Sequence, residues 1–440
     1  MLPNAPRSRF GALAAQLRSA VWPPRLFTPR KIEQSAMNAG PFRFKDPLSF
    51  PVITAAALQE RSEGVWVGPP AAPVTRLRVP PSFHDYPVGE SIFPPLHTRP
   101  PVIYPPAFAL KREKAVLTGY RTLLGADGTF CGDESFTEPA ALKNAINRLS
   151  LADEFNNEAT GLVKTGGDDE ATEFRFEQNG RPVIRDAEPI VLLCSTEPSN
   201  YGSFLFRVLP KLRTLQNAGL GQFRIMVPQY YQSMTDYLSL SGFGEKRLVP
   251  HYANAVYQLD QSILVSLRNS QAYLDDESLA YYKHMRDTYG VPSQGRRLYL
   301  TRRTLGKASN AAATRVMRNE EELITALQAH GFEVVEPSRL TAIQQIRLFS
   351  SADIIIGPSG SAMFNVVFCH PGTKLIDIET EPHWIHAHMC LFGSLGLDYG
   401  IFEGQTEDRD FSVVHKPFSV DIEALMRRLL NFEKAPRPQF

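Results

Sequence analysis

The chain has few cysteines and lacks any long apolar run. Its 440 residues include four cysteines, which are widely spaced and form neither a metal-binding pattern nor a disulfide framework. No apolar run approaches the ~20 residues needed to cross a bilayer, and there is no N-x-[ST] glycosylation sequon. The formal net charge is only +1, which argues against a general nucleic-acid binder. Together these absences favour a reducing, cytoplasmic setting.

Composition changes strongly along the chain. Twenty of the 35 prolines precede residue 110, so we expect residues 1–110 to be an extended, partly disordered extension with little helix. Residues 1–32 contain six basic residues and no acidic one. Their apolar side chains have helical spacing, which predicts weak attachment to an anionic membrane at its inner face. A transit peptide or a disordered tail has similar chemistry.

The most informative stretch is 350–379. An apolar run at 353–356 stops at Gly357-Pro-Ser-Gly-Ser361, and an amphipathic stretch at 362–370 precedes a second apolar run at 374–378. The pattern predicts strand, tight loop, helix and strand. Small residues let a ligand approach the backbone, and the N–H groups of the next helix then face an anion. The loop lacks the Lys of a P-loop and the final Gly of a nucleophile elbow, and a plain turn is the alternative.

Alternating strands and helices follow residue 110 in two successive blocks. We predict one α/β domain at 111–290, with a small antiparallel β region at 115–136, and a second at 291–410. Asn319 is expected to cap a helix through His330, and residues 411–440 to form a helix and tail that return to the first block. The fold class is therefore α/β, with two Rossmann-like domains facing across a cleft.

An ordered series of short motifs resembles glycosyltransferase family 61. The motifs lie at 200–212, 297–303, 319–321, 330–335, 344–349, 352–357, 365 and 371–377, and the resemblance covers about residues 110–405. It implies a GT-B-like architecture and inverting transfer from a nucleotide sugar, UDP-linked, to a glycan or lipid-linked glycan acceptor. It further implies a hexosyl- or pentosyltransferase of bacterial capsule or surface-polysaccharide synthesis, with no cofactor.

Two positions depart from the family. Ser203 and Ser359 stand where the family usually has histidines. A histidine can act as a general base near neutral pH, and a serine cannot do so without help. One alternative is therefore a catalytically degenerate member that binds a glycan or a partner enzyme. Another is a different enzyme on the same fold, such as a nucleotide-sugar epimerase or a pyruvyl transferase.

Donor binding requires cations and hydrogen-bond donors for the leaving diphosphate. Arg302 and Arg303 end a predicted strand and suit that need, because guanidinium groups bind phosphate in a bidentate way. The other predicted donor-binding residues are Gly357, Ser359, Gly360 and Ser361 in the loop, Asn365 as its support, and Asp377 or Glu379 as ribose acceptors.

The acceptor hydroxyl requires a base. Our prediction is Glu197, which follows the first strand of the first block, and Ser203 and His370 complete the candidate catalytic set. The alternatives are His383, His386 and His388. We predict no metal site, because His383 and His386 lack a third ordered ligand and the triplet Asp408-Arg-Asp410 falls after the core sheet.

Overall fold

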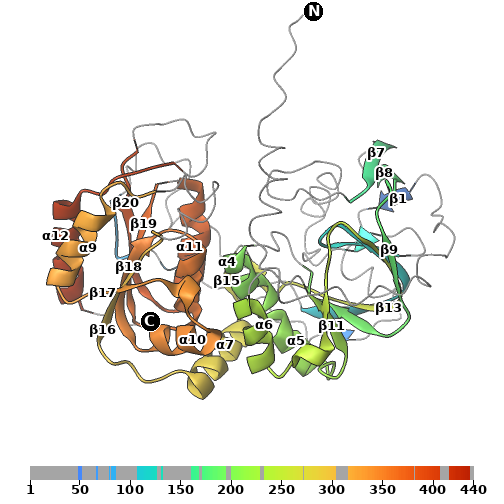
Figure 1. Cartoon of the computed structure of the whole chain (residues 1–440), viewed down its shortest axis with the longest axis horizontal. Helices are drawn as coiled ribbons and strands as arrows, with labels where there is room; N and C mark the ends of the chain where they lie inside the picture. The colour runs from blue at the N-terminus through green and yellow to red at the C-terminus, as the bar shows by residue number, and fades with distance from the viewer. Residues whose placement is uncertain are drawn as a thin grey trace, which may run out of the picture.

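The computed structural model describes most of the chain beyond residue 106. The described residues are 48–51, 66–67, 79, 81–85, 107–125, 130–131, 160–167, 171–194, 200–227, 232–270, 272–303, 316–380, 382–406 and 416–436. Two large sheets organise them, and Figure 1 shows each sheet in its own lobe with α4, α6 and α7 between them. The structure is therefore of α/β class, as predicted, with one parallel sheet and one mixed sheet.

The first sheet has nine strands in the order β12-β11-β10-β13-β4-β5-β6, with β2 on β4 and β9 on β13. Its strands are β2 (Trp66–Val67), β4 (Phe108–Thr118), β5 (Thr122–Leu124), β6 (Phe130–Cys131), β9 (Val183–Asp186), β10 (Ile190–Leu192), β11 (Arg224–Val227), β12 (Leu248–Pro250) and β13 (Val256–Val265). Strands β10 to β13 are parallel, and β4 is antiparallel to β13. The β region expected at 115–136 is thus a continuation of the main sheet rather than a separate one, because β4 pairs along nearly all of β13.

Three short strands come from the Pro-rich extension. β1 (Leu48–Pro51) pairs with β8 (Ala171–Phe176), which pairs in turn with β7 (Leu162–Gly167). β2 pairs with β4, and β3 (Phe83–His84) pairs with the last strand of the second sheet. β1 and β3 end their sheets, the positions at which proline-rich sequence is tolerated, because an edge strand can leave N–H groups unpaired.

The helical segment at 201–217 consists of three parts. α4 (Tyr201–Ser203) runs into a π-helix, η4 (Phe204–Val208), and α5 (Lys211–Asn217) follows. The break falls at Pro210, which has no backbone N–H to continue the helix. The lobe also contains α6 (Gln232–Leu240), η5 (Glu245–Arg247) and a ribbon of β14 (Asn269–Ser270) and β15 (Tyr273–Leu274), and α7 (Asp276–Tyr289) leads out of it.

The second sheet has six parallel strands in the order β17-β16-β18-β19-β20-β3. They are β16 (Arg296–Leu300), β17 (Glu333–Val335), β18 (Ala352–Pro358), β19 (Lys374–Glu379) and β20 (Asp398–Glu403), together with β3. The next strand along the chain, β17, pairs with one side of β16, and the strand after it, β18, pairs with the other side. In such sheets ligands bind outside the carboxyl ends of the strands at this reversal of order.

Helices cover both faces of the second sheet. One face packs on α9 (Glu320–Ala329) and α12 (Ile422–Lys434), and the other on α10 (Ala342–Ser350), η8 (Ser361–Phe368) and α11 (Pro382–Ser394). η7 (Pro337–Arg339) leads into α10. α12 therefore stays with the second sheet, and the expectation that it returns to the first block is wrong. Arg297 pairs with Glu433 of α12, and Arg428 pairs with Asp85 beside β3.

Two local predictions also need correction. Asn319 precedes α9 but makes no side-chain cap. Its amide instead donates to the Val420 carbonyl at 2.8 Å and accepts from the Val420 N–H at 3.0 Å, which ties the chain before α9 to the chain before α12. The helix expected at 362–370 is a 3₁₀ helix, η8, and it is mostly buried rather than amphipathic.

One hydrophobic core joins the two sheets. It includes side chains from β10, β11 and β13, from β16, β18 and β19, and from the helices α6, α7, α10 and α11. Phe206 of η4 stacks on Phe364 of η8 at 5.1 Å between ring centroids, and Tyr237 of α6 stacks on Phe368 at 5.4 Å. η4 and α6 are thereby held against η8.

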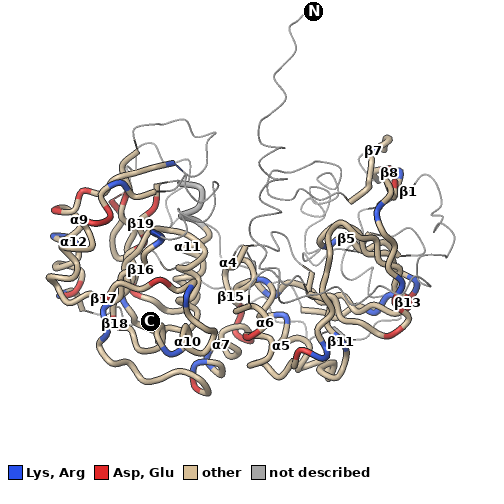
Figure 2. Tube along the Cα trace, viewed as in Figure 1, with Lys and Arg blue, Asp and Glu red and all other residues tan. Residues whose placement is uncertain are grey.

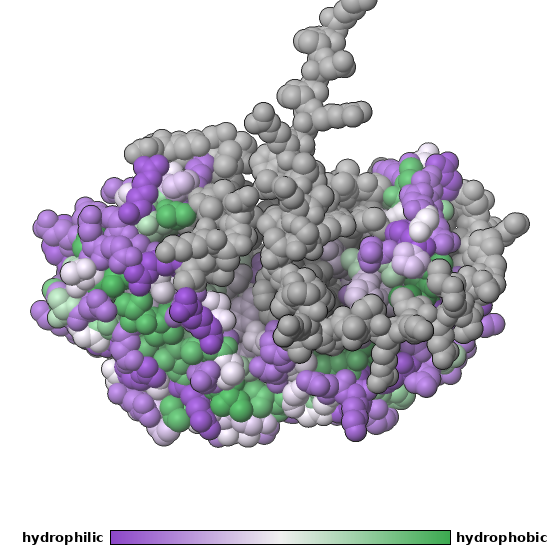
Figure 3. All heavy atoms as spheres, in the orientation of Figure 1, coloured by the Kyte–Doolittle hydropathy of each residue, from purple (hydrophilic) through white to green (hydrophobic). Residues whose placement is uncertain are grey.

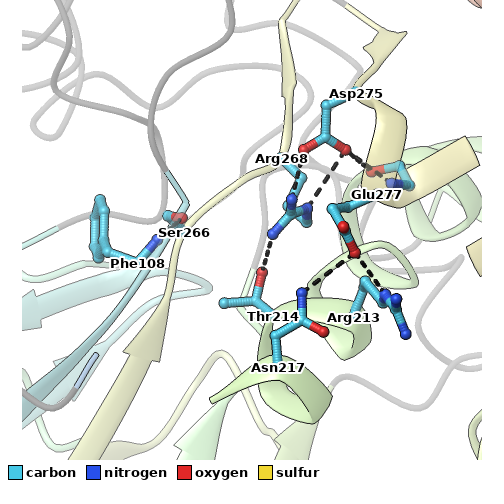
Figure 4. A network of polar contacts seen from close by, with 9 residues as sticks. Phe108, Arg213, Thr214, Asn217, Ser266, Arg268, Asp275 and Glu277 are labelled. Atoms are coloured by element: carbon cyan, nitrogen blue, oxygen red, sulfur yellow. Dashed lines mark hydrogen bonds and ion pairs between the residues drawn. The ribbon is translucent and has the colours of Figure 1, made fainter. Parts of the chain in front are cut away.

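A polar network fastens α5 to the start of α7 (Figure 4). Buried Arg268 pairs with Asp275 at 2.7 Å and donates to Thr214 of α5 at 3.0 Å. Asp275 also caps α7 by accepting from Ser278, and Glu277 pairs with Arg213 at 2.7 Å. The Asp-Asp-Glu opening of this helix therefore both caps α7 and anchors it to α5.

Charges of both signs are interspersed over the described chain (Figure 2), in keeping with the small net charge. The outer surface near α9 and α12 is largely hydrophilic in the view of Figure 3. Among the described helices, none combines the length and the apolar character needed to cross a membrane.

Candidate functional site

Three of the sequence-predicted groups lie at the carboxyl ends of neighbouring strands of the second sheet. Arg302 and Arg303 follow β16, the loop 359–361 follows β18, and Asp377 and Glu379 end β19. Parallel strands end at one edge of a sheet, and β16 and β18 flank the reversal of strand order. The structure therefore brings these residues to one place.

Arg302 lies directly over the loop. Its Nη1 donates to the Ser359 carbonyl at 2.9 Å. Gly360 has a φ of 151°, and a Cβ at that position would lie 2.8 Å from Arg302 Nη1. Only glycine permits both the backbone conformation and the close approach of the guanidinium. Gly357 has a similar packing role, because a Cβ there would lie 3.0 Å from Leu300 of β16.

Arg303 is placed differently from Arg302. Its guanidinium pairs with Glu321 of α9 at 2.5 Å, and both side chains are exposed, at 39% and 74%. The Glu321 carboxylate raises the pKa of Arg303. The next residue of α9, Glu320, is buried and accepts hydrogen bonds from Tyr299 and Thr301. Of the two predicted arginines, Arg302 is thus the one in contact with the glycine-serine loop.

Ser359, Asp377 and His388 form a buried triangle. The Ser359 hydroxyl donates to Asp377 Oδ2 at 3.0 Å and lies 2.8 Å from His388 Nδ1. His388 Nδ1 lies 2.8 Å from the same Asp377 oxygen. Asp377 is fully buried, and its Oδ1 has no hydrogen-bond partner among the described residues. His388 comes from α11, so this contact ties the helix to the ends of β18 and β19.

The same loop also contacts the first sheet. Ser361 Oγ donates to Asn200 Oδ1 at 2.9 Å, and that oxygen also accepts from the N–H groups of Gly202 and Ser203 at the start of α4. A Cβ on Gly202 would lie 2.8 Å from the Phe364 ring of η8. Glycine at this position therefore allows α4 to pack directly against η8.

Beneath this contact lies a buried network of two tyrosines and two amides. Tyr201 OH donates to Gln345 Oε1 at 2.5 Å or to Asn365 Oδ1 at 2.7 Å, and Tyr237 OH reaches the same two oxygens at 3.2 and 3.4 Å. Burial raises the pKa of Tyr201 and that of Tyr237, so both phenols stay protonated and can donate. The Asn365 amide also donates to the Ala362 carbonyl at 3.0 Å, which supports the turn after the loop.

The remaining predicted residues lie elsewhere or outside the described chain. Ser203 is buried where α4 becomes the π-helix η4. Glu379 is buried and accepts from the Thr380 N–H at 2.8 Å. His370 precedes β19, at the opposite edge of the sheet from Ser359, and its Nε2 lies 3.3 Å from the Val291 carbonyl. The structure therefore separates His370 from the loop.

Glu197 falls between residues 194 and 200, outside the described residues, and so does the triplet 408–410. His383 and His386 lie in α11, but their side chains are not among those described. No group of three or more metal-ligating side chains occurs within the described ranges.

Sequence reasoning missed the pairing of Asp377 with His388 and the network around Tyr201. The sequence did contain one signal for the Asp377–His388 pair. Asp377 interrupts an apolar strand that is buried on both faces, and a buried carboxylate needs a partner. The partner's identity was hidden, because it comes from the following helix at a spacing that no local rule fixes.

The arrangement can bind an anion next to a titratable pair. Arg302 and the loop provide a guanidinium and the backbone N–H groups of Gly360 and Ser361 at a strand end. The Asp377–His388 pair lies next to this loop, because the hydroxyl of Ser359 contacts it. A cation beside an acid–base pair suits a reaction in which an anionic group leaves while a proton is removed.

Comparison with known proteins gives one family match. Residues 201–376 match a family model described as Glycosyltransferase 61. The matched range begins at α4 and ends in β19, so it includes Arg302, the loop 359–361 and the Tyr201 network. No curated protein matches the chain.

Proposed function

Because the chain belongs to glycosyltransferase family 61, we propose that it is an inverting glycosyltransferase with a GT-B-like arrangement of its two large sheets. In this proposal it transfers a hexosyl or pentosyl group from a nucleotide sugar, UDP-linked, to a glycan. Support comes from the position of Arg302 over the glycine-serine loop at the reversal of strand order. Such positions bind nucleotides in other open parallel sheets.

In the proposed complex the second sheet binds the donor. Arg302 and the N–H groups of Gly360 and Ser361 bind the diphosphate, which gains negative charge as the sugar departs. Ser359 shapes the loop instead, because its N–H donates to the Ile378 carbonyl and its hydroxyl donates to Asp377. We assign the charged contact to Arg302 rather than Arg303, since Arg303 already pairs with Glu321. Asp377 Oδ1 and the Glu379 carboxylate are the proposed acceptors for hydroxyl groups of the ribose.

The proposed setting is bacterial capsule or surface-polysaccharide synthesis in the cytoplasm. The acceptor is then a glycan or a lipid-linked glycan at the inner face of the membrane. Support comes from the sequence, where residues 1–32 combine six basic residues with apolar side chains at helical spacing. We also propose metal-independent transfer, because the D-x-D triplet of the sequence, Asp408-Arg-Asp410, falls after the core sheet.

The function test is direct. We expect UDP, or else GDP or CMP, to raise the melting temperature of the full-length protein, and the matching nucleotide sugar to support transfer to a glycan in the presence of EDTA. Loss of transfer on chelation with recovery on adding Mn²⁺ would refute metal independence. Glycan binding without hydrolysis or transfer would favour the alternative, a degenerate member, which the serines at positions 203 and 359 motivate.

Substituting Arg302 should weaken nucleotide binding. Arg302→Ala removes a charge-assisted contact to the diphosphate, so we expect a loss of about 1.5–3 kcal/mol of binding free energy. Arg302→Lys retains the charge without the planar fork and should lose less. Titration calorimetry with UDP measures both, and Arg339→Ala is the control, because Arg339 is 69% exposed and pairs locally with Glu336. Equal affinities for the Arg302→Ala variant and the control would rule out this contact.

A further inference from the structure

Two consecutive residues at the start of α4 contact the loop 359–361 and the helix that follows it. Asn200 Oδ1 accepts from the Ser361 hydroxyl at 2.9 Å, and the Tyr201 hydroxyl lies 2.7 Å from Asn365 Oδ1 of η8. α4 follows β10 of the first sheet along the chain, whereas the loop follows β18 of the second. The position of the loop therefore depends on contacts that cross between the two sheets.

The two amides that contact Tyr201 have fixed orientations. The Gln345 amide N–H donates to the Leu340 carbonyl at 2.9 Å, and the Asn365 amide N–H donates to the Ala362 carbonyl at 3.0 Å. Both amide oxygens are therefore acceptors that face the phenol. Ala362 directly follows the loop, so the Asn365 amide connects the Tyr201 hydroxyl to the backbone of the turn.

The network has as many hydroxyl donors as amide acceptors. Each phenol donates one hydrogen bond, so Tyr201 and Tyr237 together supply one donor for each amide oxygen. Without the Tyr201 hydroxyl, Tyr237 alone must serve both oxygens, at 3.2 Å from Gln345 and 3.4 Å from Asn365. Because Gln345 is nearer, we expect the buried Asn365 oxygen to be the one that loses its donor.

We propose that Tyr201 is a positioning residue of the donor site, which acts through Asn365 on the anion-binding loop. This inference rests on the proposed function. The Tyr201 hydroxyl orients the Asn365 amide, and that amide holds the Ala362 carbonyl. The N–H groups of Gly360 and Ser361 are thereby kept in place for the diphosphate. A loop that is ordered before binding loses less conformational freedom when the ligand binds, so the affinity is higher.

The packing around the network supports this role, because it keeps α4 and η8 at a fixed distance. Gly202 lets the two helices approach so closely that a Cβ would lie 2.8 Å from the Phe364 ring. Phe206 stacks on the same ring at 5.1 Å between centroids. Asn365, the next residue of η8, is fully buried. The Tyr201 hydroxyl therefore acts on the loop without contact with the donor itself.

The first test removes the hydroxyl and keeps the ring. In Tyr201→Phe we expect the affinities for UDP and for inorganic pyrophosphate to fall by the same factor, about 3–10-fold, because the loop binds only the diphosphate. Titration calorimetry measures both affinities. Amide hydrogen exchange at 359–363 should also be faster in the variant. Tyr281→Phe is the matched control, because it removes a buried hydroxyl that bonds to Ser241 at 2.6 Å, away from the loop.

A double-mutant cycle tests whether the effect passes through Asn365. If it does, the variant Tyr201→Phe/Asn365→Ala should bind pyrophosphate no more weakly than Asn365→Ala alone. Tyr281→Phe should leave the affinity unchanged, both in the wild-type protein and in Asn365→Ala.

The outcomes separate this inference from the proposed function. Wild-type binding of the probes with equal affinity in Tyr201→Phe overturns the positioning role and leaves the proposed function intact. Additive losses in the cycle overturn it as well, because Tyr201 would then act independently of Asn365. A loss of affinity confined to UDP does the same, since the residue would then act on the nucleoside. A wild-type protein that binds neither UDP nor pyrophosphate overturns both.

Discussion

Replacing Lys374 with methionine is expected to lower the free energy of unfolding by about 3–5 kcal/mol, because it leaves a buried carboxylate without its cation. Lys374 Nζ lies 2.5 Å from Asp398 Oδ2, and the two side chains are 8% and 1% exposed. The ammonium also lies 4.4 Å from the ring centroid of Phe432, so the pair connects β19 and β20 to α12. Methionine fills a similar volume, so the change is mainly one of charge.

Urea denaturation at neutral pH measures this effect. Lys283→Met is a matched control, because Lys283 also pairs with an aspartate, Asp287, but the two side chains are 66% and 49% exposed. An exposed pair contributes about 0–1 kcal/mol. The double variant Lys374→Met/Asp398→Asn should recover much of the loss, since the amide can still accept from Ser82. If Lys374→Met proves no more destabilising than Lys283→Met, the buried pair does not contribute the expected free energy of unfolding.

The strand and helix pattern of the second sheet followed directly from the sequence. The apolar runs at 353–356 and 374–378 form the buried strands β18 and β19, as their composition predicts. Arg302 and the loop 359–361 could be placed at one edge, because parallel strands end together. Both features depend only on residues that are neighbours in the sequence: a run of apolar residues predicts a strand, and the residue that follows the run lies at the edge of the sheet.

Contacts between distant segments could not be predicted in the same way. Asn319 has the composition of a cap, but Val420, 101 residues away, provides better partners for its amide. The 3₁₀ winding of η8 depends on packing against α4 and α10, which the isolated stretch does not reveal. From the sequence, His388 could not be distinguished from the other candidate histidines, and only the fold shows that it lies beside Asp377. Tertiary packing decides each of these cases, and no local rule encodes it.

A second large effect is expected on acidification, and it centres on His251. This residue follows β12, is buried, and neither ring nitrogen makes a hydrogen bond of ordinary geometry with a described residue. The ring of Tyr257 lies against it, with centroids 5.5 Å apart. Burial lowers the pKa of His251 to about 4 from an ordinary 6.5, and the Gly119 backbone opposes only part of that shift. The folded protein therefore resists placing a charge at this position.

The sign of the pH dependence follows from proton binding. Between pH 6.5 and 4 the unfolded chain protonates this imidazole and the folded protein does not, so acid favours unfolding. The contribution of His251 should thus fall by about 3 kcal/mol as the pH drops from 7 to 4. His251→Phe removes the titrating group, so the stability of the variant relative to wild type should rise by that amount over the same range.

Denaturation of both proteins at a series of pH values tests this expectation, because the difference between the two curves cancels every other titrating group. The control is His330→Phe, in which an exposed imidazole on α9 is replaced and the wild-type slope should remain. A difference between wild type and His251→Phe that stays constant from pH 7 to pH 4 would mean that the folded protein takes up the proton at His251 as readily as the unfolded chain does. In that case the acid sensitivity must come from other groups.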